Sequence, residues 1–204
     1  MTAQPVRDPA DPEEKPESAR KAELVAKLLD YSAEHGLSSM SLRPLAAAVG
    51  SSPRVLLYLF GSKDELIREV LVRSRRNQQA LAETWVNEAS EPAERIGRLW
   101  TWLSDPAQAG IERLFFESYA RSLHDVDGPW RDFGADSVAD WVPVIEGFLV
   151  TGTRRRRSTR TRQLATFVLA TMRGLLIDLL ATGDLARADA GIRMLQDHVR
   201  MALA

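Results

Sequence analysis

Residues 41–66 read SLRPLAAAVGSSPRVLLYLFGSKDEL and contain the most informative pattern in the chain. Ser41 and Ser52 are suitable N-caps, because a serine hydroxyl can accept a hydrogen bond from a free backbone N–H in the first helical turn. Gly50 and Gly61 are suitable for ending a helix, because glycine tolerates the left-handed backbone conformation. These four residues predict two short helices, which span Leu42–Val49 and Pro53–Phe60.

Only three residues, Gly50 to Ser52, join the two predicted helices. Ala46, Gly50 and Leu56 supply a small residue at the helix crossing, a flexible turn and an apolar contact from the second helix. This spacing is typical of the helix-turn-helix, in which the second helix lies in the major groove of DNA. A short helical hairpin with a purely structural role is the alternative, because the three-residue pattern is common.

A long helix is expected directly after the second short one. Ser62 and Glu65 are spaced as in a capping box and predict a helix from Lys63 to about Asn87. Further helical patterns end at glycine or proline breaks, and no strand-like alternation persists. These additional predicted helices span 91–104, 109–124, 135–150, 158–181 and 186–203. The sequence therefore predicts an all-α fold.

The segment before residue 41 has two parts. Residues 1–18 contain four prolines and carry a net charge of −3, so they cannot bury enough apolar surface to offset the entropy of ordering. Apolar residues recur at helical spacing from Ser18 until His35. We expect a disordered acidic tail over 1–18, a helix-turn-helix domain over 19–62, and a regulatory and dimerisation domain over 63–204.

The composition excludes several kinds of site. The chain has no cysteine, which rules out disulfides and thiolate metal sites and is compatible with a reducing cytoplasm. No secretory signal is visible in the acidic first residues. The longest apolar stretch, residues 164–180, is short for a membrane span and contains Arg173 and Asp178, so we expect a buried helix. Residues 19–62 carry +2 and residues 91–153 carry −6, which suits phosphate contact at one end only.

The run from Ala19 to about Asn77 resembles the DNA-binding part of the tetracycline-repressor (TetR) family of bacterial regulators. The matching elements are His35-Gly36, Ser41-Leu42-Arg43, Ala46, Val49-Gly50, Leu56, Tyr58, Phe60 and Gly61-Ser62-Lys63-Asp64-Glu65-Leu66. The family often has an aromatic residue where Leu57 stands, and histidine or tyrosine where Leu59 stands. The resemblance implies an N-terminal three-helix helix-turn-helix DNA-binding domain and a C-terminal helical domain that binds a ligand and dimerises.

The residues expected on DNA lie at the starts of the predicted helices. Arg54 is near the start of the second short helix, where side chains reach base edges, and arginine can bond guanine O6 and N7 together. A solvated arginine is the alternative. Tyr58 can reach phosphate with its hydroxyl, and the resemblance implies that Lys63 contacts phosphate. The expected DNA-contacting residues are Ser41, Arg43, Ser51, Ser52, Pro53, Arg54, Tyr58 and Lys63.

The resemblance implies that the last two predicted helices pair with those of a second copy. The expected interface residues share one helical face, and they can equally form a core within one chain; they are Leu164, Val168, Leu175 and Leu179. The Arg154–Arg157 run could bind DNA or an anionic ligand, although such a run is more often a solvated loop.

Aromatic side chains concentrate between residues 85 and 148 and suit a pocket for a small apolar or aromatic effector. Each of them could also be an ordinary core residue. The expected pocket residues are Trp102, Phe116, Tyr119 and Trp141.

These patterns predict a ligand-responsive, sequence-specific transcriptional regulator, which binds a palindromic double-stranded operator as a cytoplasmic homodimer without a cofactor or metal. A repressor released by its effector is the usual expectation from the resemblance. The three histidines are scattered, and no glycine-rich phosphate loop or nucleophile elbow is present, which argues against an enzyme. The alternative is a helical ligand-binding or protein-interaction module with a vestigial helix-turn-helix. Leu57 and Leu59 favour this alternative, whereas Arg54 and Lys63 oppose it.

Overall fold

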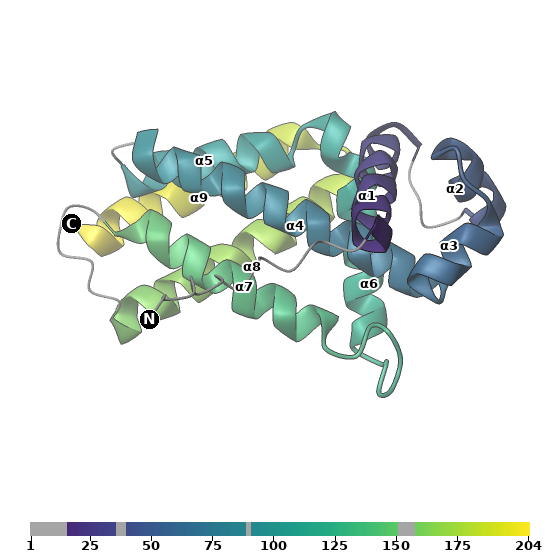
Figure 1. The fold of residues 1–204 in the computed structure, drawn as a ribbon. Helices are drawn as coiled ribbons and strands as arrows, with labels where there is room; N and C mark the ends of the chain where they lie inside the picture. Colours follow the sequence, from purple (N-terminus) through teal and green to yellow (C-terminus); the bar gives the residue numbers. More distant parts are fainter. Residues whose placement is uncertain (1–15, 36–39, 89–90, 151–157) are drawn as a thin grey trace, which may run out of the picture.

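The computed structural model describes residues 16–35, 40–88, 91–150 and 158–204, and every regular element in these ranges is a helix (Figure 1). The elements are α1 (Pro16–His35), α2 (Leu42–Ala48), α3 (Pro53–Phe60), α4 (Lys63–Glu88), α5 (Pro92–Leu103), the short 3₁₀ helix η1 (Pro106–Gln108), α6 (Ala109–Ser122), α7 (Phe133–Leu149), α8 (Thr159–Thr182) and α9 (Leu185–Leu203). The all-α prediction is confirmed, and the predicted helix ends agree with the observed ones to within two residues. Of the tail expected over 1–18, residues 16–18 belong to the first turn of α1, which corrects its predicted end, and residues 1–15 lie outside the described residues, as does the Arg154–Arg157 run.

The helix-turn-helix lies at one end of the molecule, where α2 and α3 sit beside α1 (Figure 1). We call the apolar cluster around it the N-terminal core; it consists of Leu24, Val25, Leu28, Leu45, Ala46, Val49, Leu56, Phe60, Leu66, Ile67, Val70, Leu71, Ile111, Leu114, Trp130 and Phe133. This core continues past residue 62 into α4, α6 and the start of α7. The helix-turn-helix therefore packs on the same hydrophobic cluster as the first turns of α4.

A second apolar cluster fills the rest of the molecule. In it α8 packs against α7 and α9, and α5 packs against α9. We call this cluster the C-terminal core; it consists of Ala82, Ile96, Leu99, Trp100, Trp141, Val142, Ile145, Phe148, Leu149, Ala165, Val168, Leu169, Met172, Leu176, Ala188, Ile192, Leu195 and Val199. Helix α4 contributes to both cores and therefore connects the helix-turn-helix to the C-terminal helices.

Helix α8 is only partly covered by the rest of the protein. Within the described part of the chain it is the one helix long and apolar enough, by length and composition, to cross a membrane, and 28% of its most apolar window is buried. Val168 and Met172 face the C-terminal core, whereas Phe167 and Ile177 are 47% and 51% exposed. The expectation of a buried helix is thus wrong for its outer face.

Candidate DNA-binding surface and effector pocket

The turn between α2 and α3 is closed by local hydrogen bonds. Gly50 adopts a φ of 63°, and the N–H of Ser51 donates to the carbonyl oxygen of Ala46 at 2.8 Å. The Ser52 hydroxyl accepts a hydrogen bond from the N–H of Val55 at 3.2 Å, as predicted for an N-cap. Local sequence thereby fixes how α3 starts and in which direction it leaves the turn.

Helix α3 has one buried face and one exposed face. Leu56 and Phe60, one turn apart, are 1% and 6% exposed and pack in the N-terminal core. Arg54 and Tyr58, also one turn apart, face outward, and Tyr58 is 76% exposed. Within the described ranges, Arg43 and Arg54 form no ion pair or hydrogen bond through their guanidinium groups. Two arginines and a tyrosine are therefore available to an external partner.

The structure brings the other expected DNA-contacting residues to the same end of the molecule. Ser41 occupies the N-cap position of α2, but its hydroxyl makes no capping hydrogen bond, which corrects its expected capping role. Ser52 is exposed, and Ser51, Pro53 and Lys63 are half-buried around the start of α3 and α4. The eight residues thus surround the first turns of α2, α3 and α4.

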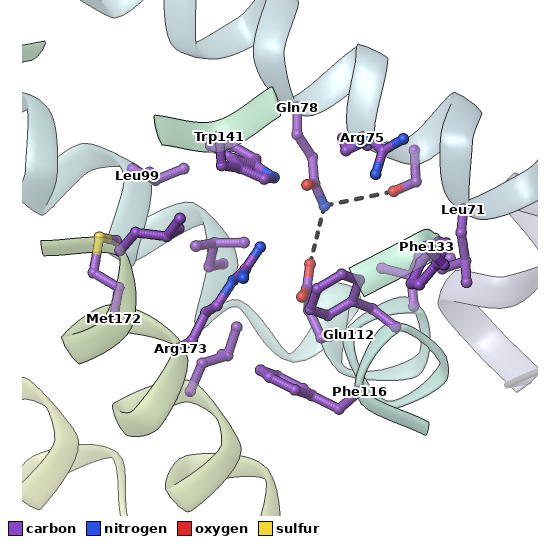
Figure 2. Close-up of a pocket in the computed structure, with 16 residues that line it drawn as sticks. Leu71, Arg75, Gln78, Leu99, Glu112, Phe116, Phe133, Trp141, Met172 and Arg173 are labelled. Carbon is purple, nitrogen blue, oxygen red and sulfur yellow. Dashed lines mark hydrogen bonds between the residues drawn. The ribbon is translucent and has the colours of Figure 1, made fainter. Parts of the chain in front are cut away.

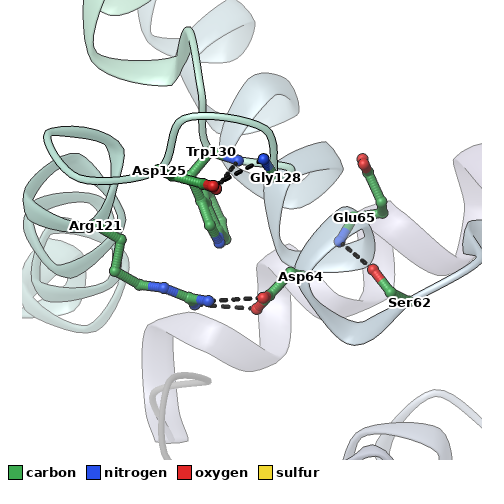
Figure 3. A network of polar contacts seen from close by, with 7 residues as sticks. All are labelled: Ser62, Asp64, Glu65, Arg121, Asp125, Gly128 and Trp130. Carbon is green, nitrogen blue, oxygen red and sulfur yellow. Dashed lines mark hydrogen bonds and ion pairs between the residues drawn. The ribbon is translucent and has the colours of Figure 1, made fainter.

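An ion pair connects the start of α4 to α6 (Figure 3). The guanidinium of Arg121 donates to both carboxylate oxygens of Asp64, at 3.0 and 2.6 Å. These hydrogen bonds lower the pKa of Asp64 and outweigh the opposing effect of partial burial. The Ser62 hydroxyl accepts a hydrogen bond from the N–H of Glu65 at 3.1 Å, as predicted for the capping box. Asp64 therefore joins α6 to the helix that follows α3 directly.

The loop between α6 and α7 supports this ion pair. Asp125 accepts hydrogen bonds from the N–H groups of Gly128 and Trp130, both at 2.8 Å. The fully buried Trp130 ring lies 5.1 Å from the Arg121 guanidinium, within the range of a cation–π contact (Figure 3). The loop thus holds the Arg121 side chain, which projects from α6, in a position to reach Asp64 on α4.

A cavity of about 60 Å³ lies between the N-terminal and C-terminal cores (Figure 2). Its lining comes from five helices, α4 to α8. Leu71 and Phe133 belong to the N-terminal core, whereas Leu99, Trp141 and Met172 belong to the C-terminal core. An occupant would therefore contact both cores and would touch α4 directly.

The polar groups of the cavity come from three helices (Figure 2). Gln78 on α4 donates to the Glu112 carboxylate of α6 at 3.0 Å, and Glu112 is only 5% exposed. Burial raises the pKa of Glu112 to about 7, although the Gln78 hydrogen bond and the charge of Arg173 oppose this. Arg173 on α8 donates to the Ser137 hydroxyl at 2.7 Å. The cavity thus combines apolar walls with an acid, a base and an amide.

The expected pocket residues divide into two groups. Phe116 and Trp141 line the cavity, and Tyr119 lies just behind it, with its ring 5.3 Å from the Arg173 guanidinium. Trp102 lies outside this cavity, in a separate open groove between α5 and α9. Leu99 and Leu103, one turn apart on α5, line the cavity. Trp102 points about 100° away from Leu103 around the helix.

Sequence reasoning missed the cavity's two charged groups, Glu112 and Arg173. The available signal was a charged residue on an otherwise apolar helix face. Glu112 precedes Phe115 and Phe116 by three and four residues, which places the three side chains on one helix face. Arg173 interrupts the longest apolar stretch of the chain and was considered only as an obstacle to membrane insertion.

Residues 30–70, which contain α2, α3 and the start of α4, match the family model described as bacterial regulatory proteins, tetR family. The helix-turn-helix end of the molecule is thus similar in sequence to the tetR family of bacterial regulatory proteins. A search among curated proteins found no match.

Several solved structures share the TetR-type fold. A TetR-family regulator from Cytophaga hutchinsonii superposes with a TM-score of 0.71 at 14% identity, covering 90% of this chain and 94% of that one. A TetR-family regulator from Rhodococcus sp. has a TM-score of 0.63 at 18% identity, covering 92% and 100%. A transcriptional regulator from Saccharomonospora viridis in complex with choline has a TM-score of 0.69 at 21% identity, covering 90% and 96%.

Two positions of α3 depart from the TetR-family pattern. Leu57, where the family often has an aromatic residue, is 43% exposed, and Leu59 is half-buried against the N-terminal core. Both leucines leave the buried contacts of Leu56 and Phe60 in place. The departure at Leu57 therefore affects the surface of α3, whereas Leu59 also packs at the edge of the N-terminal core.

The expected dimer residues lie largely inside the protomer. Val168 is fully buried in the C-terminal core, which contradicts its expected place on an interface. Leu164, Leu175 and Leu179 are half-buried and pack against the same core. A core within one chain therefore accounts for these four residues better than an interface does. The large exposed apolar side chains of α8 and α9 stand at other positions, which include Phe167, Ile177, Met194 and Met201.

Proposed function

We propose that this TetR-type protein is a sequence-specific regulator of transcription, which binds a palindromic operator as a cytoplasmic homodimer and responds to a small effector. The observation that carries the proposal is the outward face of α3. Arg54 and Tyr58 point away from the N-terminal core on a helix whose other face is fully packed. A helix held in this way by a helix-turn-helix presents its outer residues to the major groove.

The proposed DNA contacts divide by their chemistry. Arg54, near the N-terminus of α3, is assigned to a guanine edge, because a guanidinium can donate to O6 and N7 together. Tyr58, Arg43 and Lys63 are assigned to phosphate, with Ser41, Ser51, Ser52 and Pro53 completing the contact surface. Phosphate contacts position the helix, whereas base contacts specify the sequence.

The proposed dimer forms through the exposed apolar faces of α8 and α9. Phe167 and Ile177 on α8, and Met194 and Met201 on α9, are each at least 47% exposed although they are large and apolar. A group of exposed apolar side chains on two adjacent helices is typical of a protein–protein interface. To bind a palindromic operator, such a dimer must place its two copies of α3 about 34–36 Å apart, one turn of DNA.

The proposed effector site is the cavity between the two cores. A cavity of about 150 Å³ holds benzene, so the present cavity of about 60 Å³ must widen to hold an aromatic effector. Four lining residues, Leu71, Ser74, Arg75 and Gln78, belong to α4, whose first turn follows α3. Widening would therefore move α4 and change the placement of α3. The choline complex of the Saccharomonospora viridis regulator supports a small-molecule effector for this fold.

The proposed consequence of effector binding is release from DNA, which would make the protein a repressor. An effector shifts the equilibrium only by its difference in affinity for the two states. The effector favours the state of the protein in which the cavity is widened. The state with the narrow cavity of about 60 Å³ is assigned to DNA binding.

Salt dependence of DNA binding tests the proposal. Fluorescence anisotropy with a labelled duplex, repeated at several salt concentrations, gives a slope of about −0.9 per neutralised phosphate. The variant Lys63→Gln is expected to reduce this slope by about one per protomer. Arg76→Gln, an exposed site on the same helix, is the matched control and should leave the slope unchanged. A slope near zero for the unmodified protein would overturn the proposal and favour the vestigial module.

A further inference from the structure

The cavity contains two opposite charges that do not pair with each other. Glu112 enters from α6 and Arg173 from α8, and both point into the same space (Figure 2). Glu112 accepts a hydrogen bond from Gln78 through one carboxylate oxygen, and Arg173 donates to Ser137. Neither forms an ion pair with another residue that the structure describes. Arg173 also interacts with Tyr119 and donates to the Ser137 carbonyl oxygen at 3.4 Å, so one carboxylate oxygen of Glu112 and part of the Arg173 guanidinium remain for an occupant.

The other charged groups near the cavity cancel each other. Arg75 on α4 forms an ion pair with Asp140 on α7 at 3.0 Å, between its Nε and the Oδ2 of the aspartate. The charges that face the cavity without such a partner are therefore one carboxylate and one guanidinium. Between two equal and opposite charges the potentials largely cancel, whereas the fields add. A dipole gains energy in that arrangement, but an ion gains little and still loses its hydration.

The apolar part of the cavity indicates the chemistry of the rest of the ligand. Phe115 and Phe116 on α6 and Trp141 on α7 offer aromatic surface, and Met172 on α8 is an adaptable side chain that can move to admit a ring. The Arg173 guanidinium lies 5.5 Å from the centre of the Phe115 ring, so the position where this ring could bind a cation is already taken. A second cation placed there would be repelled by the guanidinium.

The geometry points to an effector without net charge, in which a hydrogen-bond donor and an acceptor lie side by side on an aromatic or branched apolar body. A primary or secondary carboxamide has this arrangement: its N–H donates to Glu112 and its carbonyl oxygen accepts from Arg173. This assignment names the ligand class of the proposed effector cavity and in that respect rests on the proposed function.

Three probes of nearly identical shape test this assignment: benzamide is neutral, benzamidinium is a cation and benzoate is an anion. Methionine-methyl NMR at pH 8.5, where Glu112 is ionised, reports binding and its location. The methyl of Met172 lines the cavity, whereas those of Met194 and Met201 are exposed on α9 and serve as internal controls. Benzamide is expected to shift the Met172 signal, to leave those of Met194 and Met201 unchanged, and to bind at least about tenfold more tightly than either ion.

Glu112→Gln tests the origin of this preference, since the glutamine carbonyl keeps the acceptor for Gln78 and removes the charge. The cavity then keeps only the charge of Arg173, and benzoate is expected to become the tightest of the three probes. The assignment is overturned if benzamidinium or benzoate binds tightest to the unmodified protein, if Glu112→Gln leaves the order unchanged, or if no probe shifts Met172. The salt titration with DNA decides the proposed function separately, because it needs no ligand.

Discussion

Replacing Glu112 with glutamine is expected to stabilise the protein above neutral pH. Burial raises the pKa of this carboxyl from 4.5 to about 7 in the folded state. Since each pKa unit corresponds to about 1.4 kcal/mol, ionising Glu112 in the folded protein costs about 3 kcal/mol once the pH exceeds 7. The attraction of Arg173 is already contained in this value, because it is one of the effects that oppose the rise.

The sign of the pH dependence of stability follows because the pKa of Glu112 is higher in the folded state than in the unfolded state. Glu112 is neutral in both states below about pH 4.5, so its contribution to stability is then fully present. It is lost progressively as the pH rises toward 7. Glutamine cannot ionise, so Glu112→Gln should gain less than about 1 kcal/mol in the free energy of unfolding at pH 5 and about 3 kcal/mol at pH 8.5.

Urea unfolding at these two pH values measures the difference, with the protein concentration held fixed because dimer formation couples stability to concentration. Glu117→Gln is the matched control, since Glu117 is exposed on the same helix. An equal effect of Glu112→Gln at both pH values, or a destabilisation at pH 8.5, would refute the reasoning.

Three further experiments test the packing, the ion pair and the dimer face. Leu56→Ala removes a fully buried side chain and should cost about 2–5 kcal/mol in urea unfolding, whereas the exposed Leu57→Ala should cost less than about 0.5 kcal/mol; equal costs would contradict the assigned faces of α3. Asp64→Asn should cost less than about 1 kcal/mol, because both partners are partly exposed, and a double-mutant cycle with Arg121→Ala isolates the pair. Met194→Glu should yield monomers in analytical ultracentrifugation, and an unchanged dimer would rule out that face.

The helices could be predicted closely because their ends depend on capping and turn residues only a few positions away in the sequence. Ser52 caps α3, Gly50 closes the turn, and Ser62 caps the first turn of α4, each within a few residues of its partner. A helix period also showed that Leu56 and Phe60 point inward. None of these conclusions requires knowledge of which helices pack together.

The cavity could not be predicted in the same way, because its residues meet only in the folded chain. Glu112 and Arg173 come from α6 and α8, 61 positions apart in the sequence. Trp102 was a reasonable pocket candidate by composition, but its phase on α5 turns it away from the cavity. Val168 has the spacing of an interface residue, yet α7 and α9 cover it. Periodicity identifies an apolar face but not the partner that covers it.

The ion pair at Asp64 shows the same limit. The sequence placed Asp64 in the capping box, where an acidic residue favours a helix N-terminus. Its bond to Arg121 spans 57 positions and depends on how α6 crosses α4. The link between α4 and α6 at Asp64 is therefore a property of the packed helices.

Selection of bound duplexes from a random DNA pool, run beside Arg54→Ala, tests the central claim most directly. The unmodified protein is expected to enrich an inverted repeat whose half-sites are centred about 10 base pairs apart, or a multiple of this. Arg54→Ala should relax the preference at one position of each half-site, since a bidentate arginine contributes about 1–3 kcal/mol of discrimination. Absence of any enriched sequence at low salt, or an enriched sequence that Arg54→Ala leaves unchanged, would contradict it.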